Sequence, residues 1–413
     1  MNILFLTITQ LEDINAGGIY PDLLKFFHEQ NHNIYVVSPR ERKYNLETEF
    51  FEKDKVKHLA VKIGNITKTK FIEKGISTIT LEGKILKAIK KHLNNVKFDL
   101  VMYSTPPITF NKIVRYIKKR DNAKTYLLLK DIFPQNAIDL KLFPKMSPIY
   151  WYFRRKEKKL YKAADYIGCM SKRNVEYILK HNKYLDEQRV EICPNTITPK
   201  EIVISTEEKV RLKEKYNLPL DKNIFLYGGN LGKPQAIDFI MDVIKENEAS
   251  ENNYILIIGS GTEYNKLETF LREKEIKKAK QLSFMAKDDY DKMVGMANVG
   301  LIFLDKRFTI PNFPSRLLSY MEGSIPVLAA TDVNTDVGEI IEEEKFGFWC
   351  ETGDLEKFME HMKKLEDKNL RQELGLNGNK YMLNNYTSKH AYKIIMKHFN
   401  EKEWRTCLKE KSY

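Results

Sequence analysis

The chain has 413 residues, of which 42% are hydrophobic, and it carries a formal net charge of +13. This is enough for two domains with substantial cores, which argues against a disordered chain, and no apolar run approaches the roughly 20 residues that span a bilayer. We expect no signal peptide, because residues 2–7 have a strand pattern without a basic segment before it. The four scattered cysteines show no metal-binding spacing and indicate a reducing, cytoplasmic setting.

Strand and helix patterns alternate through the first half of the chain. We expect strands at 2–8, 33–37, 100–103, 124–129, 166–170 and 190–193, and helices at 19–30, 81–93, 148–163 and 173–181. A strand–helix–strand start predicts a parallel sheet with helices on its faces. The polar, basic segment 40–74 shows weak periodicity, and we expect it to be a long connection that provides acceptor contacts or mobility.

Three features of this half bear on function. Gly17 and Gly18 follow the first strand, at the sheet edge where α/β domains bind ligands. Ser38 follows the second strand, where a nicotinamide-binding domain has an acidic residue, so NAD is not expected. Lys130 and Asp131 end another strand, and this charged pair is either part of a functional cleft or an exposed strand end.

An aromatic run is followed directly by a basic run in the expected helix 148–163. Residues 149–153 are Ile-Tyr-Trp-Tyr-Phe, and residues 154–159 contain five cations. This pattern suits an interface with anionic lipid headgroups. It equally suits an aromatic stripe that faces the core beside a solvated basic face.

Residues 194–199 break the alternation and form the expected linker. In the second half we expect strands at 224–227, 254–258, 281–284, 299–303 and 326–330, a helix at 207–216, another after residue 236, a short one from about 315 to 323, and a final amphipathic helix at 389–404. The glycine-rich stretch 228–232 with Lys233 joins a strand to a helix, which suits a phosphate but also an ordinary turn. Arg316 beside a second helix start supplies another cation, and two such places suit a diphosphate.

Several stretches together resemble the family 4 glycosyltransferases of bacterial capsule and O-antigen synthesis. They are Asn15–Tyr20 (NAGGIY), Ser104–Pro107 (STPP), Leu127–Gln135 (LLLKDIFPQ), Cys193–Asn195 (CPN), Gly228–Lys233 (GGNLGK) and Phe313–Val327 (FPSRLLSYMEGSIPV). The resemblance covers essentially the whole chain. It implies an α/β protein of the GT-B fold, with two Rossmann-like domains facing a central cleft. The implied acceptor domain is 1–197 plus a returning helix at about 388–413, and the implied nucleotide-sugar domain is 198–387.

The resemblance also implies roles for individual residues. In the catalytic role it places Asp131, Lys233 and Arg316, and beside the acceptor it places Tyr20, Ser104 and Lys130. On the nucleotide sugar it places Gly17, Gly18, Gly229, Asn230, Gly232, Lys233, Gly259, Phe284, Met285, Ser315, Arg316, Leu317, Leu318, Ser319 and Glu322. The family's two glutamates, eight residues apart, fall at Pro311 and Ser319. The ribose-binding carboxylate is therefore missing, and Glu322 is a substitute one turn further on.

The function expected from this resemblance is transfer of a sugar from a UDP-sugar to a polyprenyl-diphosphate-linked saccharide, with retention of configuration. We expect the enzyme to be cytoplasmic and peripheral on the anionic inner-membrane surface, without a cofactor, a metal or a nucleic-acid partner. Asp289 and Asp291 form the chain's D-x-D pattern, but acidic residues are ordinary in a first helical turn. Two alternatives remain, a non-catalytic protein that binds nucleic acid or an anionic surface, and a UDP-sugar epimerase.

Overall fold

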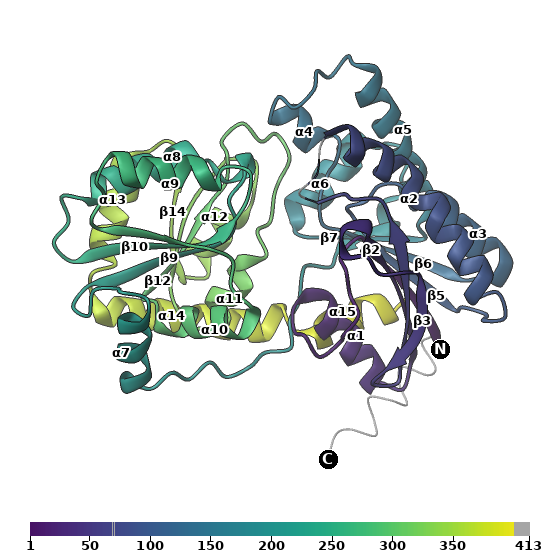
Figure 1. Ribbon diagram of the computed structural model, residues 1–413, viewed down its shortest axis with the longest axis horizontal. Helices are drawn as coiled ribbons and strands as arrows, with labels where there is room; N and C mark the ends of the chain where they lie inside the picture. Colours follow the sequence, from purple (N-terminus) through teal and green to yellow (C-terminus); the bar gives the residue numbers. More distant parts are fainter. Residues whose placement is uncertain (68, 70, 400–413) are drawn as a thin grey trace. The chain divides into compact units, whose positions relative to one another are not determined.

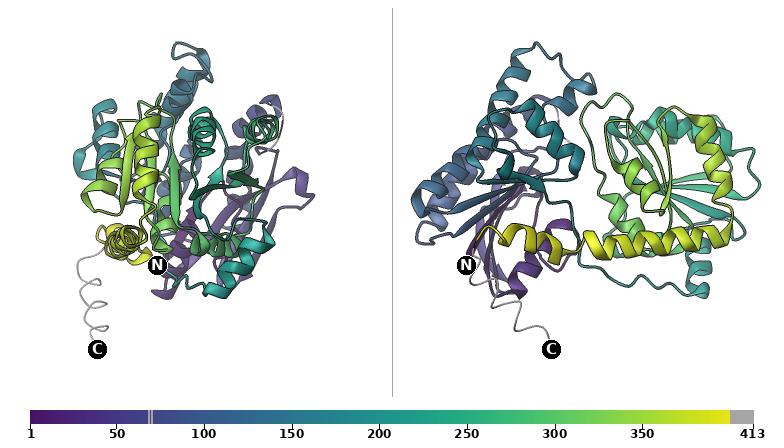
Figure 2. Two further views of the ribbon diagram at one scale, coloured as in Figure 1. Left: turned by 90° about the vertical axis from the view of Figure 1, so that its left-hand side faces the viewer. Right: turned by 180° about the vertical axis from the view of Figure 1, so that it is seen from behind.

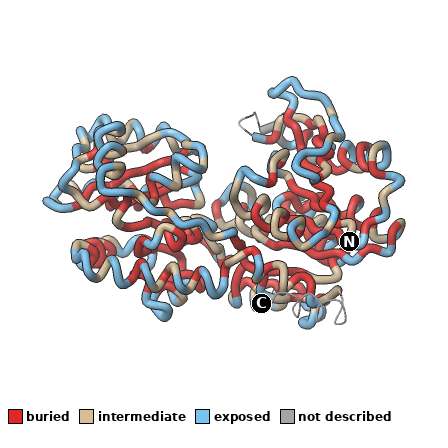
Figure 3. Tube along the Cα trace, turned by 90° about the horizontal axis from the view of Figure 1, so that it is seen from below, coloured by how far each residue is buried: buried red, intermediate tan, exposed pale blue. Residues whose placement is uncertain are grey.

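The computed structural model describes residues 1–67, 69 and 71–399, and the chain divides into two compact units (Figure 1). Unit one contains Met1–Thr198 together with residues 388–399, and unit two contains Pro199–Thr387. Each unit has a mainly or wholly parallel sheet between helices. In Figure 3 the buried positions gather in the middle of each unit and the exposed ones lie toward its outside, in connections and on the outer faces of helices.

Unit one contains an eight-stranded sheet in the order β3-β4-β2-β1-β5-β6-β7-β8. All neighbouring strands are parallel except β3 and β4. The bounds are β1 Asn2–Leu6, β2 Asn33–Glu41, β3 Glu49–Lys53, β4 Val56–Ile63, β5 Leu100–Ser104, β6 Lys124–Leu129, β7 Tyr166–Cys169 and β8 Val190–Ile192. Central strands such as β1 and β5 are apolar almost throughout, because helices cover both of their faces.

The helices of unit one are α1 Ile19–Glu29, α2 Phe71–His92, α3 Asn111–Asp121, α4 Gln135–Asp139, α5 Pro148–Ala163, α6 Lys172–His181 and α15 Ser388–Met396. The last of these, α15, packs on α1, and the right-hand view of Figure 2 shows it at the end of the chain's yellow segment. Tyr392 of α15 lies 4.8 Å from the ring of Phe27, and its hydroxyl lies 3.1 Å from Nε2 of His32. The final helix thus completes the hydrophobic core of unit one, and residues 400–404 of its expected length lie outside the described residues.

The expectation of a long irregular connection over residues 40–74 is wrong. The segment contains an antiparallel hairpin of β3 and β4, in which Phe51 pairs with His58. Asp54 and Lys55 make the turn, with φ angles of 51° and 62°. Two positive φ angles are typical of the tight turn that suits hairpin twist, but its usual residues are asparagine and glycine. The charged turn and the charged edge strand β3 therefore concealed the hairpin.

Unit two contains a six-stranded, wholly parallel sheet in the order β11-β10-β9-β12-β13-β14. The strands are β9 Asn223–Asn230, β10 Asn253–Ser260, β11 Ala279–Leu282, β12 Val299–Phe303, β13 Val327–Thr331 and β14 Gly347–Glu351. The helices are α7 Thr206–Lys215, α8 Ile237–Asn247, α9 Tyr264–Glu273, α10 Lys287–Met296, α11 Arg316–Glu322, α12 Val337–Glu343, α13 Leu355–Lys364 and α14 Lys368–Asn385. One face of the sheet packs with α8 and α13 into a single core, which holds β9 and β12 rigidly.

Candidate functional site

The sheet of unit two reverses its strand order between β9 and β12. The chain adds β10 and β11 on one side of β9, and β12, β13 and β14 on the other. Parallel α/β sheets bind ligands at the carboxyl ends of the strands beside such a reversal. β9 and β12 pair only through Phe225 with Val299 and Leu226 with Gly300, so their ladder stops well before the carboxyl ends. The candidate site of unit two is this edge.

Arg316, the first residue of α11, lies at this edge against the end of β9. Its guanidinium carbon is 4.3 Å from the centre of the Tyr227 ring, and a Cβ added to Gly229 would lie 3.3 Å from its Nη2. Its Nη1 is buried and has no hydrogen-bond partner within the described part of the chain. An unsatisfied buried cationic donor is costly. An anionic oxygen that reached Nη1 would form a charge-assisted hydrogen bond.

Tyr320, one turn after Arg316 on α11, fills the space where β9 and β12 part. Its hydroxyl accepts a hydrogen bond from the N–H of Gly228 at 3.2 Å and lies 3.0 Å from the carbonyl oxygen of Leu301. A Cβ on Gly300 would lie 2.3 Å from the Tyr320 ring, so that position accepts only glycine without rearrangement. The buried phenol fixes α11, and with it Arg316, against two strands.

The glycine-rich turn is compact because two neighbouring strands approach each other closely there. Gly259 pairs with Gly229 in the β9–β10 ladder, and a Cβ on Gly259 would lie 1.9 Å from the Gly229 carbonyl oxygen. Gly229 has a φ of 129°, which side-chain-bearing residues rarely adopt. The close contact between two strands therefore explains the glycines at positions 229 and 259.

Lys233 lies between the glycine-rich stretch and α8. It opens a short 3₁₀ helix, Lys233–Gln235, and α8 begins only at Ile237, after Ala236 in a left-handed conformation. Lys233 is exposed, whereas Gly232 is buried and its N–H donates to Oε1 of Gln235. The Asn230 side-chain amide donates to the same oxygen. Lys233 is therefore a mobile charge beside the turn, and Arg316 is the fixed one.

The other donor-side residues on α11 have backbone groups that are already engaged. The N–H of Leu317 donates to Pro314 and that of Leu318 to Ser315, both at 3.2 Å. Ser315 is exposed and its side chain makes no capping hydrogen bond, and Ser319 is half-buried. These N–H groups are thus less available to a diphosphate than the sequence suggests, which leaves the cations as the main positive charge.

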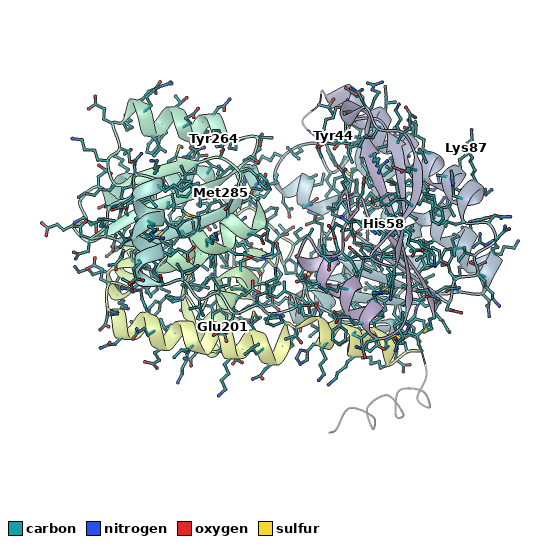
Figure 4. The ribbon with its side chains drawn as sticks, turned by 60° about the horizontal axis from the view of Figure 1, so that its bottom comes forward. Tyr44, His58, Lys87, Glu201, Tyr264 and Met285 are labelled. Carbon is teal, nitrogen blue, oxygen red and sulfur yellow. The ribbon has the colours of Figure 1, made fainter. Side chains whose placement is uncertain are left out.

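Glu322 and the loop before α10 complete the predicted donor side. Glu322 is only 5% exposed, and its Oε1 accepts a hydrogen bond from the N–H of Lys200 at 2.9 Å. That contact gives the carboxylate a structural role, and its ribose role stays a prediction. Phe284 is 74% exposed, and Met285, labelled in Figure 4, is half-buried. An exposed phenylalanine ring in a loop is suited to stacking on a base.

The sheet of unit one reverses its strand order between β1 and β5, and most predicted residues of that unit lie there. Gly17 and Gly18 follow β1 with φ angles of 71° and 110°, and a Cβ on Gly18 would meet nothing within 4 Å. The pKa of Tyr20 is raised to about 12 by burial, with the Ser104 hydroxyl and the Asp131 carboxylate beside it. The structure thus brings these residues together at one sheet edge.

Lys130 and Asp131 form the turn after β6, and Thr105 fixes it. The N–H groups of Lys130 and Asp131 donate to Oγ1 of Thr105 at 3.0 and 3.2 Å. Burial raises the pKa of Asp131 to about 6 and lowers the pKa of Lys130 to about 8. Such shifts are typical of groups that exchange protons in enzymes. Lys130 Nζ lies 3.4 Å from the Cys193 carbonyl oxygen, which turns it toward β8.

Sequence reasoning missed the residues that hold Arg316 in place. Tyr227, Tyr320 and Tyr290 surround the switch point of unit two, and a Cβ on Gly228 would lie 1.9 Å from the Tyr290 hydroxyl oxygen. In the sequence these tyrosines are indistinguishable from core aromatics. The available signal was the spacing of Arg316 and Tyr320, which places both on one face of a helix.

Comparison with known proteins agrees with this geometry. The family model described as "Glycosyl transferases group 1" matches residues 208–381. The chain is 23% identical over 258 residues to a probable glycosyltransferase, WbjE, of Pseudomonas aeruginosa, which covers 62% of this chain and 63% of that protein. It is 21% identical to an uncharacterized glycosyltransferase, MJ1069, of Methanocaldococcus jannaschii, over 90% of each chain.

Solved structures share the fold across nearly the whole chain. A sucrose-phosphate synthase from Thermosynechococcus elongatus superimposes with a TM-score of 0.74 at 13% identity, over 97% of this chain and 98% of that one. Anabaena Alr3699/HepE, in complex with UDP and glucose, superimposes with a TM-score of 0.71 at 13% identity, over 96% and 99%. The two Rossmann-like sheets and these superpositions show that the chain has the GT-B fold, and residues 208–381 match the group 1 glycosyltransferase family.

Proposed function

We propose that this protein is a glycosyltransferase that transfers a sugar from a UDP-sugar to a lipid-linked saccharide acceptor in the synthesis of a surface polysaccharide. The observation that carries the donor half is the buried, unpartnered Nη1 of Arg316 at the switch point of unit two. The solved relative HepE holds UDP and glucose, and WaaG, another structure with this fold, is involved in lipopolysaccharide biosynthesis. Both relatives support the substrate class.

The chemistry of the proposed reaction follows from the charges. The diphosphate gains negative charge as the bond to the sugar breaks, and fixed cations that stabilise this charge lower the barrier. Arg316 is preorganised by Tyr227, and the exposed Lys233 adds a second cation beside the same turn. Two cations at this edge support a mechanism that is independent of metal. Retention of configuration is part of the proposal on the strength of the family resemblance.

The acid–base part of the proposal belongs to unit one. Asp131, with its pKa raised to about 6, is ionised at neutral pH yet remains basic enough to accept a proton or to stabilise a cationic sugar carbon. Tyr20 and Ser104 lie beside it. We assign Asp131 to the reacting sugar and the two hydroxyls to the acceptor side.

The membrane half of the proposal rests on residues 141–162 of unit one. Five large apolar side chains are exposed within eleven residues: Leu142, Met146, Ile149, Trp151 and Tyr152. Exposed cations surround them at Lys141, Lys145, Arg155, Lys158, Lys159 and Lys162. The one acidic residue of the segment, Glu157, is buried and bonded to Arg154 and Tyr161. We call residues 141–162 the basic apolar patch.

The basic apolar patch suits a lipid surface with anionic headgroups, because aromatic side chains favour the interface and cations gain from the surface charge. Helix α5 combines both interpretations of its sequence, since Tyr150 and Leu160 are buried while Trp151 and Tyr152 are exposed. Among the described residues, no helix is sufficiently long and apolar to cross a membrane. The association that we propose is peripheral and uses the basic apolar patch.

The experiment that tests the donor site is calorimetric titration with UDP, GDP and NAD in the presence of EDTA. We expect UDP alone to bind the parent protein, and the double variant Lys233→Ala, Arg316→Ala to lose that binding. The exposed Arg272 of α9 provides the control, because Arg272→Ala removes a cation from the same unit and should bind UDP normally. If UDP fails to bind the parent, or needs a metal to do so, the proposal is wrong. Conversion of a free UDP-sugar without acceptor would indicate an epimerase instead.

A further inference from the structure

Unit one contains a pocket of about 500 Å³ that the proposed reaction does not yet use. It lies between the segment 10–16 after β1, Arg40 of β2 and one face of β3. A volume of this size is within the range of small-molecule sites in proteins. The segment 10–16 leads directly into Gly17 and Gly18, so the pocket adjoins the switch point of unit one.

One face of the edge strand β3 forms a wall of the pocket. Glu49, Phe51 and Lys53 line it, whereas Phe50 and Glu52 are not among the lining residues. This follows from the strand's period of two, which sends alternate side chains to opposite faces. Phe50 instead lies 6.4 Å from the ring of His92. Two lining side chains of β3, Phe51 and Glu49, therefore have a neighbour of the same chemistry on the other face, Phe50 and Glu52.

Ion pairs hold the polar side of the pocket in place. Arg40 is 6% exposed and binds both carboxylate oxygens of Glu12, at 2.8 and 2.7 Å, and Oε2 of Glu49 at 2.8 Å. Lys53 Nζ lies 2.6 Å from Oδ2 of Asp13. The two cations are thus already paired, and a phosphate would have to displace a carboxylate. Carboxylate oxygens keep spare lone pairs, which suit the hydroxyl donors of a neutral ligand.

Phe51 supplies the apolar part of the wall. Its ring stacks on the buried His58 with centroids 5.2 Å apart at an angle of 13°, and the Arg40 guanidinium carbon lies 5.6 Å from its centre. Figure 4 shows His58 among the strands of unit one. The imidazole is fixed by its Nδ1, 3.3 Å from the Leu11 carbonyl oxygen. The aromatic wall is therefore rigid, and a ligand that packs on it loses little freedom.

We propose that this pocket binds an uncharged sugar residue of the acceptor saccharide. Its hydroxyls donate to the carboxylates of Glu12, Asp13 and Glu49, and its C–H groups pack against Phe51. The inference rests on the proposed function, and it names the part of the acceptor that unit one recognises. Three carboxylates and two cations line the pocket, so an anionic sugar is disfavoured relative to a neutral one.

The test uses the full-length protein without nucleotide, so that it does not depend on the donor site. Binding of three probes is measured by saturation-transfer NMR: methyl β-D-glucopyranoside, methyl N-acetyl-β-D-glucosaminide and glucuronic acid. Phe51→Ala is compared with Phe50→Ala, and Glu49→Gln with Glu52→Gln. We expect at least one neutral glycoside to bind the parent and both far-face variants, and to bind Phe51→Ala and Glu49→Gln about tenfold more weakly.

Three results would overturn the inference: no neutral glycoside binds the parent, both phenylalanine variants lose binding equally, or glucuronic acid binds best. UDP titration of the same variants separates this inference from the proposed function. Phe51→Ala should bind UDP as the parent does, because Arg316 belongs to the other unit. A parent that binds the glycoside but not UDP would leave the pocket in place and contradict the transferase proposal.

Discussion

The guanidinium of Arg316 lies over the ring of Tyr227, with 4.3 Å between the guanidinium carbon and the ring centre. This contact joins the start of α11 to the end of β9 and keeps Nη2 over the glycine-rich turn. A lysine at this position retains the charge but loses both the stacking plane and the fork of donors. We therefore expect Arg316→Lys to weaken UDP binding about tenfold and Arg316→Ala about a hundredfold. Calorimetry measures these affinities, and unchanged melting temperatures show that the variants are folded. Full UDP affinity in Arg316→Lys would contradict the role of the forked guanidinium donors.

Tyr227 itself should act as a positioning residue. Tyr227→Leu keeps an apolar side chain in the core but removes the ring beneath Arg316 and the hydroxyl that donates to the Asn230 carbonyl at 2.7 Å. We expect UDP affinity to fall several-fold while Tyr227→Phe, which keeps the ring, retains it. A structural role alone would lower the melting temperature of both variants without separating their affinities for UDP.

Gly259 should tolerate no side chain. In Gly259→Ala the new Cβ would lie 1.9 Å from the Gly229 carbonyl oxygen, so β9 and β10 must move apart at the turn. Strain of this kind costs about 1–3 kcal/mol, and we expect a lower melting temperature together with weaker UDP binding. Gly83→Ala is the control, because Gly83 is an exposed position of helix α2 and a Cβ there meets nothing within 4 Å. Normal stability of Gly259→Ala would contradict this steric requirement for glycine.

The raised pKa of Asp131 predicts how stability depends on pH. Because the folded-state pKa of about 6 exceeds the ordinary value of 3.8, folding favours the protonated acid. This stabilisation is complete below pH 3.8 and is lost as pH rises through about 6. Relative to Asp131→Asn, the parent should lose roughly 1–3 kcal/mol of unfolding free energy between pH 4 and 7. Denaturant titrations at both pH values measure it.

The same group predicts the pH profile of activity. If the ionised carboxylate acts on the sugar, transfer by the parent should rise with pH through about 6, and Asp131→Asn should lack this step. Tyr20 titrates near 12 and adds nothing to this range. If Asp131→Asn keeps the parent's pH profile of transfer, Asp131 has no part in the mechanism.

The basic apolar patch should bind anionic vesicles. We expect the double variant Met146→Ser, Trp151→Ser to sediment with phosphatidylglycerol vesicles at least tenfold less well than the parent. Leu376→Ser, Leu383→Ser is the matched control, since these leucines of α14 are 66% and 46% exposed on unit two. Equal losses in the two double variants, or equal binding to neutral phosphatidylcholine vesicles, would contradict the assignment.

Strands and helices could be predicted where the hydrophobic pattern and the boundary residues indicated the same element. The expected strand 124–129 and helix 148–163 coincide with β6 and α5, because an uninterrupted apolar run marks the strand and Ser147 with Pro148 marks the helix start. The hairpin of β3 and β4 was not predictable, since its turn is Asp54-Lys55 and its edge strand is charged. Edge strands carry such charges to avoid pairing with other chains, which weakens their pattern.

The charged residues of the candidate site could be predicted from the sequence, but the residues that hold them in place could not. Arg316 and Lys233 carry charge beside glycines, which the sequence displays directly. The closeness of Gly259 to Gly229 depends on strand register, and the contact of Tyr320 with Gly300 depends on where β9 and β12 part. Both are relationships between distant segments, and hydrophobic periodicity contains no information on them.

The buried phenol of Tyr320 separates two properties of the proposed site, the position of Arg316 and the choice of nucleotide or sugar. Its hydrogen bond to Gly228 and its fit against Gly300 anchor the arginine through the sheet, independently of the exposed loop at Phe284. In the proposed site, changes in that loop can therefore alter which nucleotide or sugar is accepted while Arg316 keeps its position for the phosphate. Evolved or engineered substitutions in the loop can therefore change the substrate without altering the buried contacts that hold Arg316.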